Sequence, residues 1–202
     1  MPPLTLDPKS TALVLIDLQR GIVAGDTKPH AAKDVVARAV RLARRFREAG
    51  ALVVLVHVDP GPHGVLFPRP EADQPRPPFN APPDFAEIVP DLGPEPGDAV
   101  VLKHQPNAFY ATDLEVHLVR RGIRTIVLGG IATNLGVEST ARAAHERGYE
   151  QLFVEDAMAA RAPELHEFPV TKTFPTMGRV RTTEEVLAGL VVTTEAADPS
   201  PS

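Results

Sequence analysis

Short apolar runs constrain the fold of this chain more than any other feature. They lie at residues 11–17, 51–58, 99–103, 124–128 and 151–154, with a shorter candidate at 179–181. Within each of the long runs the apolar residues are consecutive and do not alternate with polar ones. This pattern is typical of parallel strands that are buried on both faces.

Segments with helical periodicity lie between these runs, at residues 33–49, 112–121, 135–147 and 182–190. The first three are followed by Gly50, Gly122 and Gly148, in the position that favours the end of a helix. The second and fourth begin with Thr-x-x-Glu, which predicts a capping box. Strands that alternate with helices predict an α/β sandwich around a parallel sheet.

Composition limits the classes of function. The chain has 202 residues, 43% of them hydrophobic, which fits one soluble domain of ordinary size. A formal charge of −5 predicts no binding to nucleic acid or to an anionic membrane. No segment resembles a signal peptide or a membrane span, so a cytoplasmic location is expected. Four arginines at helical spacing predict a solvated helix face: Arg41, Arg44, Arg45 and Arg47.

The chain contains no cysteine. This excludes disulfides, thiolate metal sites and catalysis by a thiol.

Residues 59–98 interrupt the alternation of strands and helices. Twelve of the 22 prolines lie in this segment, and it shows neither helical nor strand periodicity. Proline density favours an ordered excursion over a flexible linker. We therefore expect a single domain over residues 1–192 that includes this excursion, followed by a disordered tail at residues 193–202.

The segment from Gly129 to Arg142, GGIATNLGVESTAR, follows a β-branched run and opens a helical pattern, so it predicts a strand-to-helix elbow. With Asp17 and Lys103 it resembles the isochorismatase-like hydrolases, also called the cysteine hydrolase superfamily. The resemblance covers about residues 13–190. It implies a three-layer α/β/α sandwich around a six-stranded, mainly parallel sheet. It also implies a homo-oligomer of two or more subunits, in which the excursion contributes to a pocket lid and to subunit contacts.

Three residues that are distant in the sequence are expected to lie on one rim of the sheet. Asp17 ends the first strand, Lys103 ends the third, and Gly136 lies just beyond the fourth. Ligands of open α/β sheets bind at the carboxyl ends of the strands. The resemblance implies that Asp17 is the catalytic acid or base and that Lys103 is its charged partner. Gly136 holds the position where most members of the family carry the nucleophilic cysteine.

A glycine at position 136 leaves two functions open. Isochorismatases proper also have glycine here, and they hydrolyse a vinyl ether after an aspartate protonates the enol carbon. They carry a tyrosine and a histidine where this chain has Ala132 and Asn134. Lys103 should lower the pKa of Asp17 while burial should raise it, and the sequence does not decide between the two. The chain is therefore a hydrolase of a small molecule that uses no cysteine, or a metabolite-binding protein without activity.

Five further residues are candidates for substrate binding. Gln19 lies two residues after Asp17, and Phe109 lies in a stretch where the family's phenylalanine lines the pocket. The other three belong to the elbow: Ile131, Ala132 and Asn134. The resemblance implies a cis peptide between Ile131 and Ala132, and backbone amides that hold an anion or an oxyanion.

No cofactor or metal is expected. Nicotinamidases of the family hold zinc through Asp-x-His and a later histidine, but here Gly61 stands two residues after Asp59. His57, Asp59 and His63 are at best a partial site. The remaining histidines show no ligand spacing, and surface or capping roles are expected for them: His30, His104, His117, His145 and His166. No phosphate-binding glycine motif follows any strand.

Overall fold

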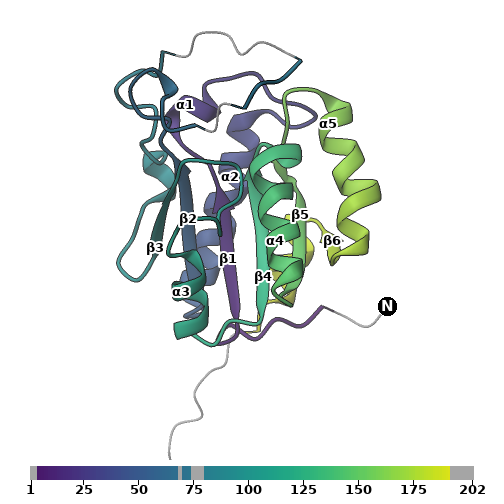
Figure 1. Ribbon diagram of the computed structural model, residues 1–202. Helices are drawn as coiled ribbons and strands as arrows, with labels where there is room; N and C mark the ends of the chain where they lie inside the picture. The colour runs from purple at the N-terminus through teal and green to yellow at the C-terminus, as the bar shows by residue number, and fades with distance from the viewer. Residues whose placement is uncertain (1–3, 68–69, 74–79, 192–202) are drawn as a thin grey trace, which may run out of the picture.

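Six parallel strands form the centre of the structure, in the order β3-β2-β1-β4-β5-β6 (Figure 1). A computed structural model describes residues 4–67, 70–73 and 80–191. The strands are β1 (Thr11–Ile16), β2 (Leu52–Val58), β3 (Ala99–Lys103), β4 (Thr125–Ile131), β5 (Glu150–Ala159) and β6 (Arg179–Arg181). The α/β fold with a six-stranded parallel sheet is confirmed.

Helices cover both faces of this sheet (Figure 1). The α-helices are α1 (Arg20–Val23), α2 (Ala32–Glu48), α3 (Leu114–Arg120), α4 (Glu138–Glu146), α5 (Pro163–Phe168) and α6 (Thr183–Gly189). Two π-helical turns lie at Thr133–Val137 and Pro169–Thr173, and short 3₁₀ turns lie at Pro62–Gly64, Pro90–Leu92 and Phe174–Thr176. One hydrophobic cluster joins α2 and α6 to one face of the sheet, and a second joins α3 and α4 to the other.

Strand β1 shows why its apolar residues are consecutive. All six of its residues are buried, since β2 and β4 flank it and helices cover both faces. Strand β3 differs from the pattern expected of a strand buried on both faces. Val100 and Leu102 are 41% and 43% exposed. Because β3 is the edge strand of the sheet, only its alternate residues meet the core.

Helix boundaries follow side-chain hydrogen bonds more closely than sequence motifs. Thr182 and Glu185 form the predicted capping box at the start of α6. The box predicted at Thr112 is wrong. The Thr112 hydroxyl donates back to the carbonyl of Ala108, and helix α3 begins only at Leu114. The same hydroxyl accepts a hydrogen bond from the N–H of Leu114 at 3.2 Å, two residues on, whereas a capping box requires the bond from the third residue.

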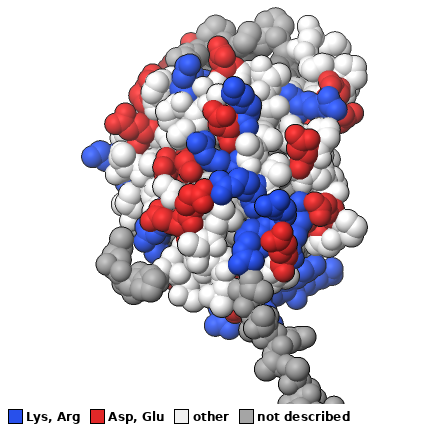
Figure 2. Space-filling view, turned by 180° about the vertical axis from the view of Figure 1, so that it is seen from behind, with Lys and Arg blue, Asp and Glu red and all other residues white. Residues whose placement is uncertain are grey.

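Helix α2 carries the arginine cluster, and these residues make specific contacts as well as meeting solvent. Arg41 pairs with Glu184 at 2.7 Å, while Arg47 pairs with Asp98, also at 2.7 Å. The Arg47 side chain is only 15% exposed, and that of Asp98 is 2% exposed. Figure 2 shows acidic and basic residues interspersed on this rear view of the molecule. The prediction of a simply solvated face is therefore wrong for Arg47, which anchors the loop before β3.

Residues 85–89 of the 59–98 excursion pack beside the segment that follows the central strand β1. Phe85 and Val89 are buried, and Ile88 pairs with Gln19 in an isolated antiparallel bridge. Residues 68–69, 74–79 and the predicted tail at 193–202 lie outside the described residues. No helix in the described part of the chain is long and apolar enough to cross a membrane.

Candidate active site

Asp17 directly follows the central strand β1. Its backbone has φ of 54°, and its N–H donates to the carbonyl of Val56 on the neighbouring strand. A positive φ is uncommon outside glycine, although aspartate tolerates it better than most residues. The turn directs the side chain into the interior, where Asp17 is only 5% exposed.

Lys103 ends strand β3 and reaches the same carboxylate. Its Nζ donates to Asp17 Oδ2 at 2.8 Å and to the carbonyl of Gln105 at 3.1 Å. The lysine is 2% exposed, so the ion pair is excluded from bulk water. Removing one partner of such a pair would leave the other charged and buried, which typically costs several kcal/mol.

Gly136 lies against this ion pair. A Cβ built at position 136 would lie 2.8 Å from Ile16 Cγ2, 3.0 Å from Asp17 Oδ2 and 3.6 Å from Lys103 Nζ. Any side chain here would therefore press on the carboxylate and on β1. The expectation that Asp17, Lys103 and Gly136 meet at the carboxyl ends of their strands is confirmed as a matter of position.

Burial determines that the pKa of Asp17 is raised and not lowered. Desolvation is the largest influence, and it raises the pKa of this carboxyl to about 6, although Lys103 and His57 act to lower it. Asp17 Oδ2 is bonded to Lys103, whereas the buried Oδ1 has no hydrogen-bond partner among the described residues. The site thus holds a carboxyl group with one free oxygen that gains or loses its proton near neutral pH.

The elbow joins β4 to α4 through the π-helical turn. The peptide between Ile131 and Ala132 is cis, as the resemblance implies. Before it, Gly130 has φ of 122°, and a side chain on it would collide with the backbone carbonyl of Ile16. Ile131 is buried, while Ala132 and Asn134 are partly buried. Only glycine allows β4 to approach β1 this closely, directly behind Asp17.

Two candidates for substrate binding have structural contacts instead. The Gln19 side chain donates to the carbonyls of Val58 and Phe85 and accepts from the N–H of Val58. All of its polar atoms thus serve to fasten β2 and the excursion together. Phe109 is 5% exposed and lies among the core residues packed by α3 and α4, with the Arg147 guanidinium 4.8 Å above its ring. These contacts give both side chains a structural role, and their roles as substrate contact and pocket wall stay predictions.

A polar group beside the elbow was not predicted. His166 of α5 is 4% exposed, and its Nδ1 lies 2.9 Å from the hydroxyl of Thr133. The surface or capping role expected for His166 is therefore wrong. Burial is the first cause, and nearby His30 the second, that lowers its pKa to about 4. Sequence spacing gives no signal for this contact, because 33 residues separate its two members.

Two of the residues considered as a partial zinc site, His57 and Asp59, form hydrogen bonds with other groups. His57 Nδ1 lies 2.8 Å from the carbonyl of Ala86, and Asp59 accepts a hydrogen bond from the N–H of Gly61. Among the described residues, the three that could hold a metal ion together are His30, Glu155 and His166.

Comparison with known proteins gives a consistent family. Residues 11–185 match the model of the isochorismatase domain. The chain is 45% identical to the uncharacterized isochorismatase family protein YwoC of Bacillus subtilis over 93% of this chain and 97% of that one. It is 33% identical to the ureidoacrylate amidohydrolase RutB of Methylorubrum extorquens over 82% of this chain and 76% of that one. An isochorismatase family protein of Burkholderia thailandensis has a similar structure, with a TM-score of 0.87 and 44% identity over 93% of this chain and 98% of that one.

Proposed function

This chain belongs to the isochorismatase family of hydrolases, and we propose that it hydrolyses a small molecule with Asp17 as the acid or base and without a cysteine nucleophile. One observation carries the proposal. A buried carboxyl with a pKa of about 6 and one unpartnered oxygen lies directly against Gly136. Carboxyl groups with a pKa raised toward neutrality are suited to proton transfer at physiological pH.

Each residue of the site has a proposed role. Asp17 transfers the proton through Oδ1, the oxygen that Lys103 leaves free. Lys103 fixes the orientation of the carboxylate and stabilises its charged form. The elbow from Ile131 to Gly136 receives an anionic or carbonyl group of the substrate on its backbone amides. Glycine at position 136 lets the backbone of the elbow lie directly beside the Asp17 carboxylate, where any Cβ would press on it.

Vinyl-ether hydrolysis is the reaction that fits these roles best. The protonated carboxyl of Asp17 gives its proton to the enol carbon, and water then attacks the resulting oxocarbenium ion. The adduct breaks down to a carbonyl compound and an alcohol, and the proton released by the water returns to Asp17. Neither step requires a covalent bond to the protein, so Gly136 is no obstacle. Amide hydrolysis, the activity in the name of RutB, would need water to attack the carbonyl directly.

The decisive experiment measures pyruvate release from isochorismate, with a panel of small amides tested in parallel. Asp17→Asn keeps the shape of the side chain and removes its proton chemistry, so turnover should disappear. Asp113→Asn makes the same change on an exposed carboxylate at the start of α3 and should retain full activity. Equal turnover by the Asp17→Asn variant and the wild type would refute the assigned role.

The pH profile distinguishes acid from base. If the protonated carboxyl is the reactive form, kcat/KM falls as the pH rises through about 6, because Asp17 loses its proton there. If the carboxylate acts as base, kcat/KM rises over the same interval. A profile flat through this interval would contradict both roles.

A second function is favoured by Gly136 itself. Without a nucleophile, and with Ala132 and Asn134 in place of the tyrosine and histidine of isochorismatases, the scaffold could bind a metabolite and leave it unchanged. In that case a ligand raises the melting temperature and is recovered intact after long incubation. Turnover that depends on Asp17 would exclude this alternative.

A further inference from the structure

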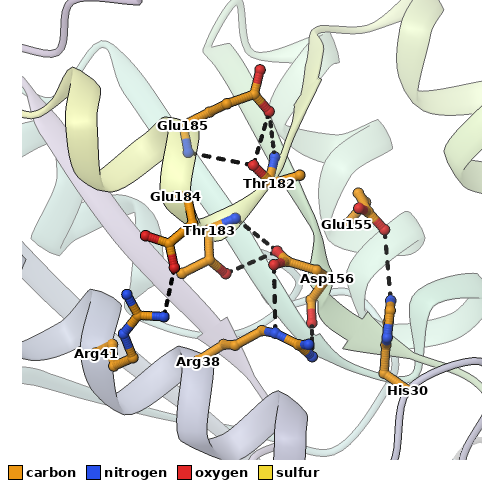
Figure 3. Close-up of polar contacts among 9 residues, drawn as sticks. All are labelled: His30, Arg38, Arg41, Glu155, Asp156, Thr182, Thr183, Glu184 and Glu185. Carbon is orange, nitrogen blue, oxygen red and sulfur yellow. Dashed lines mark hydrogen bonds and ion pairs between the residues drawn. The ribbon is translucent and has the colours of Figure 1, made fainter.

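His30, Glu155 and His166 come from three separate elements and meet beside the elbow. Each offers one ligand atom, and the three atoms lie within 4.8 Å of one another. His30 Nε2 is 3.6 Å from Glu155 Oε2, and the rings of His30 and His166 are edge-to-face with centroids 5.8 Å apart. Figure 3 shows the carboxylate of Glu155 directed toward His30, while that of the adjacent Asp156 turns toward Arg38 and Thr183.

The backbone holds these residues in place. Lys28 and Ala160 exchange two hydrogen bonds of 2.8 Å, which fasten the loop before α2 to the end of β5. The hydroxyl of Thr27 donates to the carbonyl of His30 at 2.8 Å, so the loop is also closed internally. Glu155 lies in the part of β5 where its register with β4 shifts. Backbone hydrogen bonds therefore fix the loop that carries His30 beside the strand that carries Glu155.

The geometry points to a site for a divalent transition-metal ion, of which zinc is the best match, held by His30, Glu155 and His166. Two histidines and one carboxylate form a common ligand set for zinc with one position left open to water. At the usual metal–ligand lengths, tetrahedral ligands are roughly 3.4 Å apart, close to the His30–Glu155 separation. The partly exposed side chains of His30 and Glu155 can rotate toward His166 to close the remaining gap.

His166 already has the surroundings of a metal ligand. Its Nδ1 is engaged by the Thr133 hydroxyl, which orients the ring and leaves Nε2 for an ion. The imidazole ring is only 4% exposed, so the protein and not bulk water surrounds the nitrogen that would bind the ion. The side chains of His30 and Glu155 are 26% and 31% exposed, so an ion can enter from solvent. Bound metal would thus connect the loop, β5 and α5 to Thr133, a residue of the elbow.

The test titrates zinc into the full-length chain, prepared metal-free and without a polyhistidine tag. We expect one ion per chain with a dissociation constant in the micromolar range or below, at least about tenfold weakened in His30→Ala and in Glu155→Gln. These two side chains are partly exposed, so both variants should fold, whereas replacing buried His166 carries more risk. Two matched controls change an exposed histidine, His145→Ala, and an exposed glutamate at the start of β5, Glu150→Gln. Both control variants should bind zinc like the wild type.

Cobalt provides a second readout that does not depend on affinity. Bound at this site, cobalt should show the intense visible bands of four-coordination without thiolate charge transfer, since the chain has no cysteine. The absence of saturable zinc binding up to about 1 mM would overturn the proposal. Equal binding by wild type and His30→Ala would do the same. Binding lost on His63→Ala, but not on His30→Ala, would move the metal to the 57–63 segment and equally refute the site.

Discussion

The protonation of Asp17 should be visible in the stability of the fold. The pKa of this carboxyl is raised from 3.8 to about 6 in the folded protein, chiefly by burial. The folded state therefore binds a proton more tightly than the unfolded state between these two values. It follows that the free energy of unfolding must decrease as the pH rises through this interval. Asp17→Asn removes the titrating group and keeps the shape of the side chain.

The expected size follows from the two pKa values. The difference between 3.8 and about 6 corresponds to roughly 3 kcal/mol, because each pKa unit is worth about 1.4 kcal/mol. The free energy of unfolding of the wild type should therefore fall by about 3 kcal/mol, relative to that of Asp17→Asn, between about pH 4 and about pH 7. Other acidic groups titrate in both proteins and cancel in the difference. Solvent screens this carboxyl little, because Asp17 is only 5% exposed.

Urea unfolding of both proteins at several pH values measures this difference directly. The double variant Asp17→Asn/Lys103→Met is a second reference, because it excludes any titration of an unpaired lysine. The wild type should lose stability against both references over the same interval. Stability curves of wild type and Asp17→Asn that stay parallel would refute the reasoning. A wild type that gains relative stability as the pH rises would show that Lys103 outweighs burial.

Four further substitutions test other parts of the structure. Gly130→Ala should lower the free energy of unfolding by more than about 3 kcal/mol, because its Cβ would collide with the Ile16 carbonyl. Gly136→Ala should lower it by about 1–2 kcal/mol, because its Cβ would meet side chains and not backbone. Equal losses in urea unfolding would contradict this order. Thr182→Ala should cost about 1 kcal/mol through the lost cap, and an unchanged urea midpoint would show that the cap is not needed. Gly136→Cys should introduce weak amide hydrolysis, measured as ammonia release, because the Cβ of the new side chain would lie 3.0 Å from Asp17 Oδ2. Complete inactivity would mean that the site no longer supports catalysis by a thiol.

The sequence predicts the central part of the site because general rules of sheet architecture apply there. Asp17, Lys103 and Gly136 each lie at or just beyond the carboxyl end of a strand, and parallel strands present those ends along one edge. Their positions therefore follow from element order alone. Their catalytic roles remain predictions, since position does not establish chemistry.

The remaining contacts depend on packing between distant segments, which a single sequence does not encode in local form. The sequence places Gln19 near the site but does not show that its side chain donates to the carbonyl of Phe85, which lies 66 residues away in the excursion. His166 looks like a surface residue until α5 is placed against the elbow. Thr112 and Thr182 share one motif, yet only Thr182 forms a capping box, because α6 begins directly after Thr182 whereas α3 begins two residues after Thr112.

The order of the strands also affects how the chain is made. Strand β1 is central to the sheet and pairs with β4 at residues 125–130, yet it is synthesised first. One long edge of this apolar strand must therefore stay unpaired until more than half of the 202 residues have been translated. Such an edge can pair wrongly with other chains, and an incomplete chain is most exposed to this hazard on the ribosome. The strand that is best protected in the finished protein is thus the one that waits longest for protection during its synthesis.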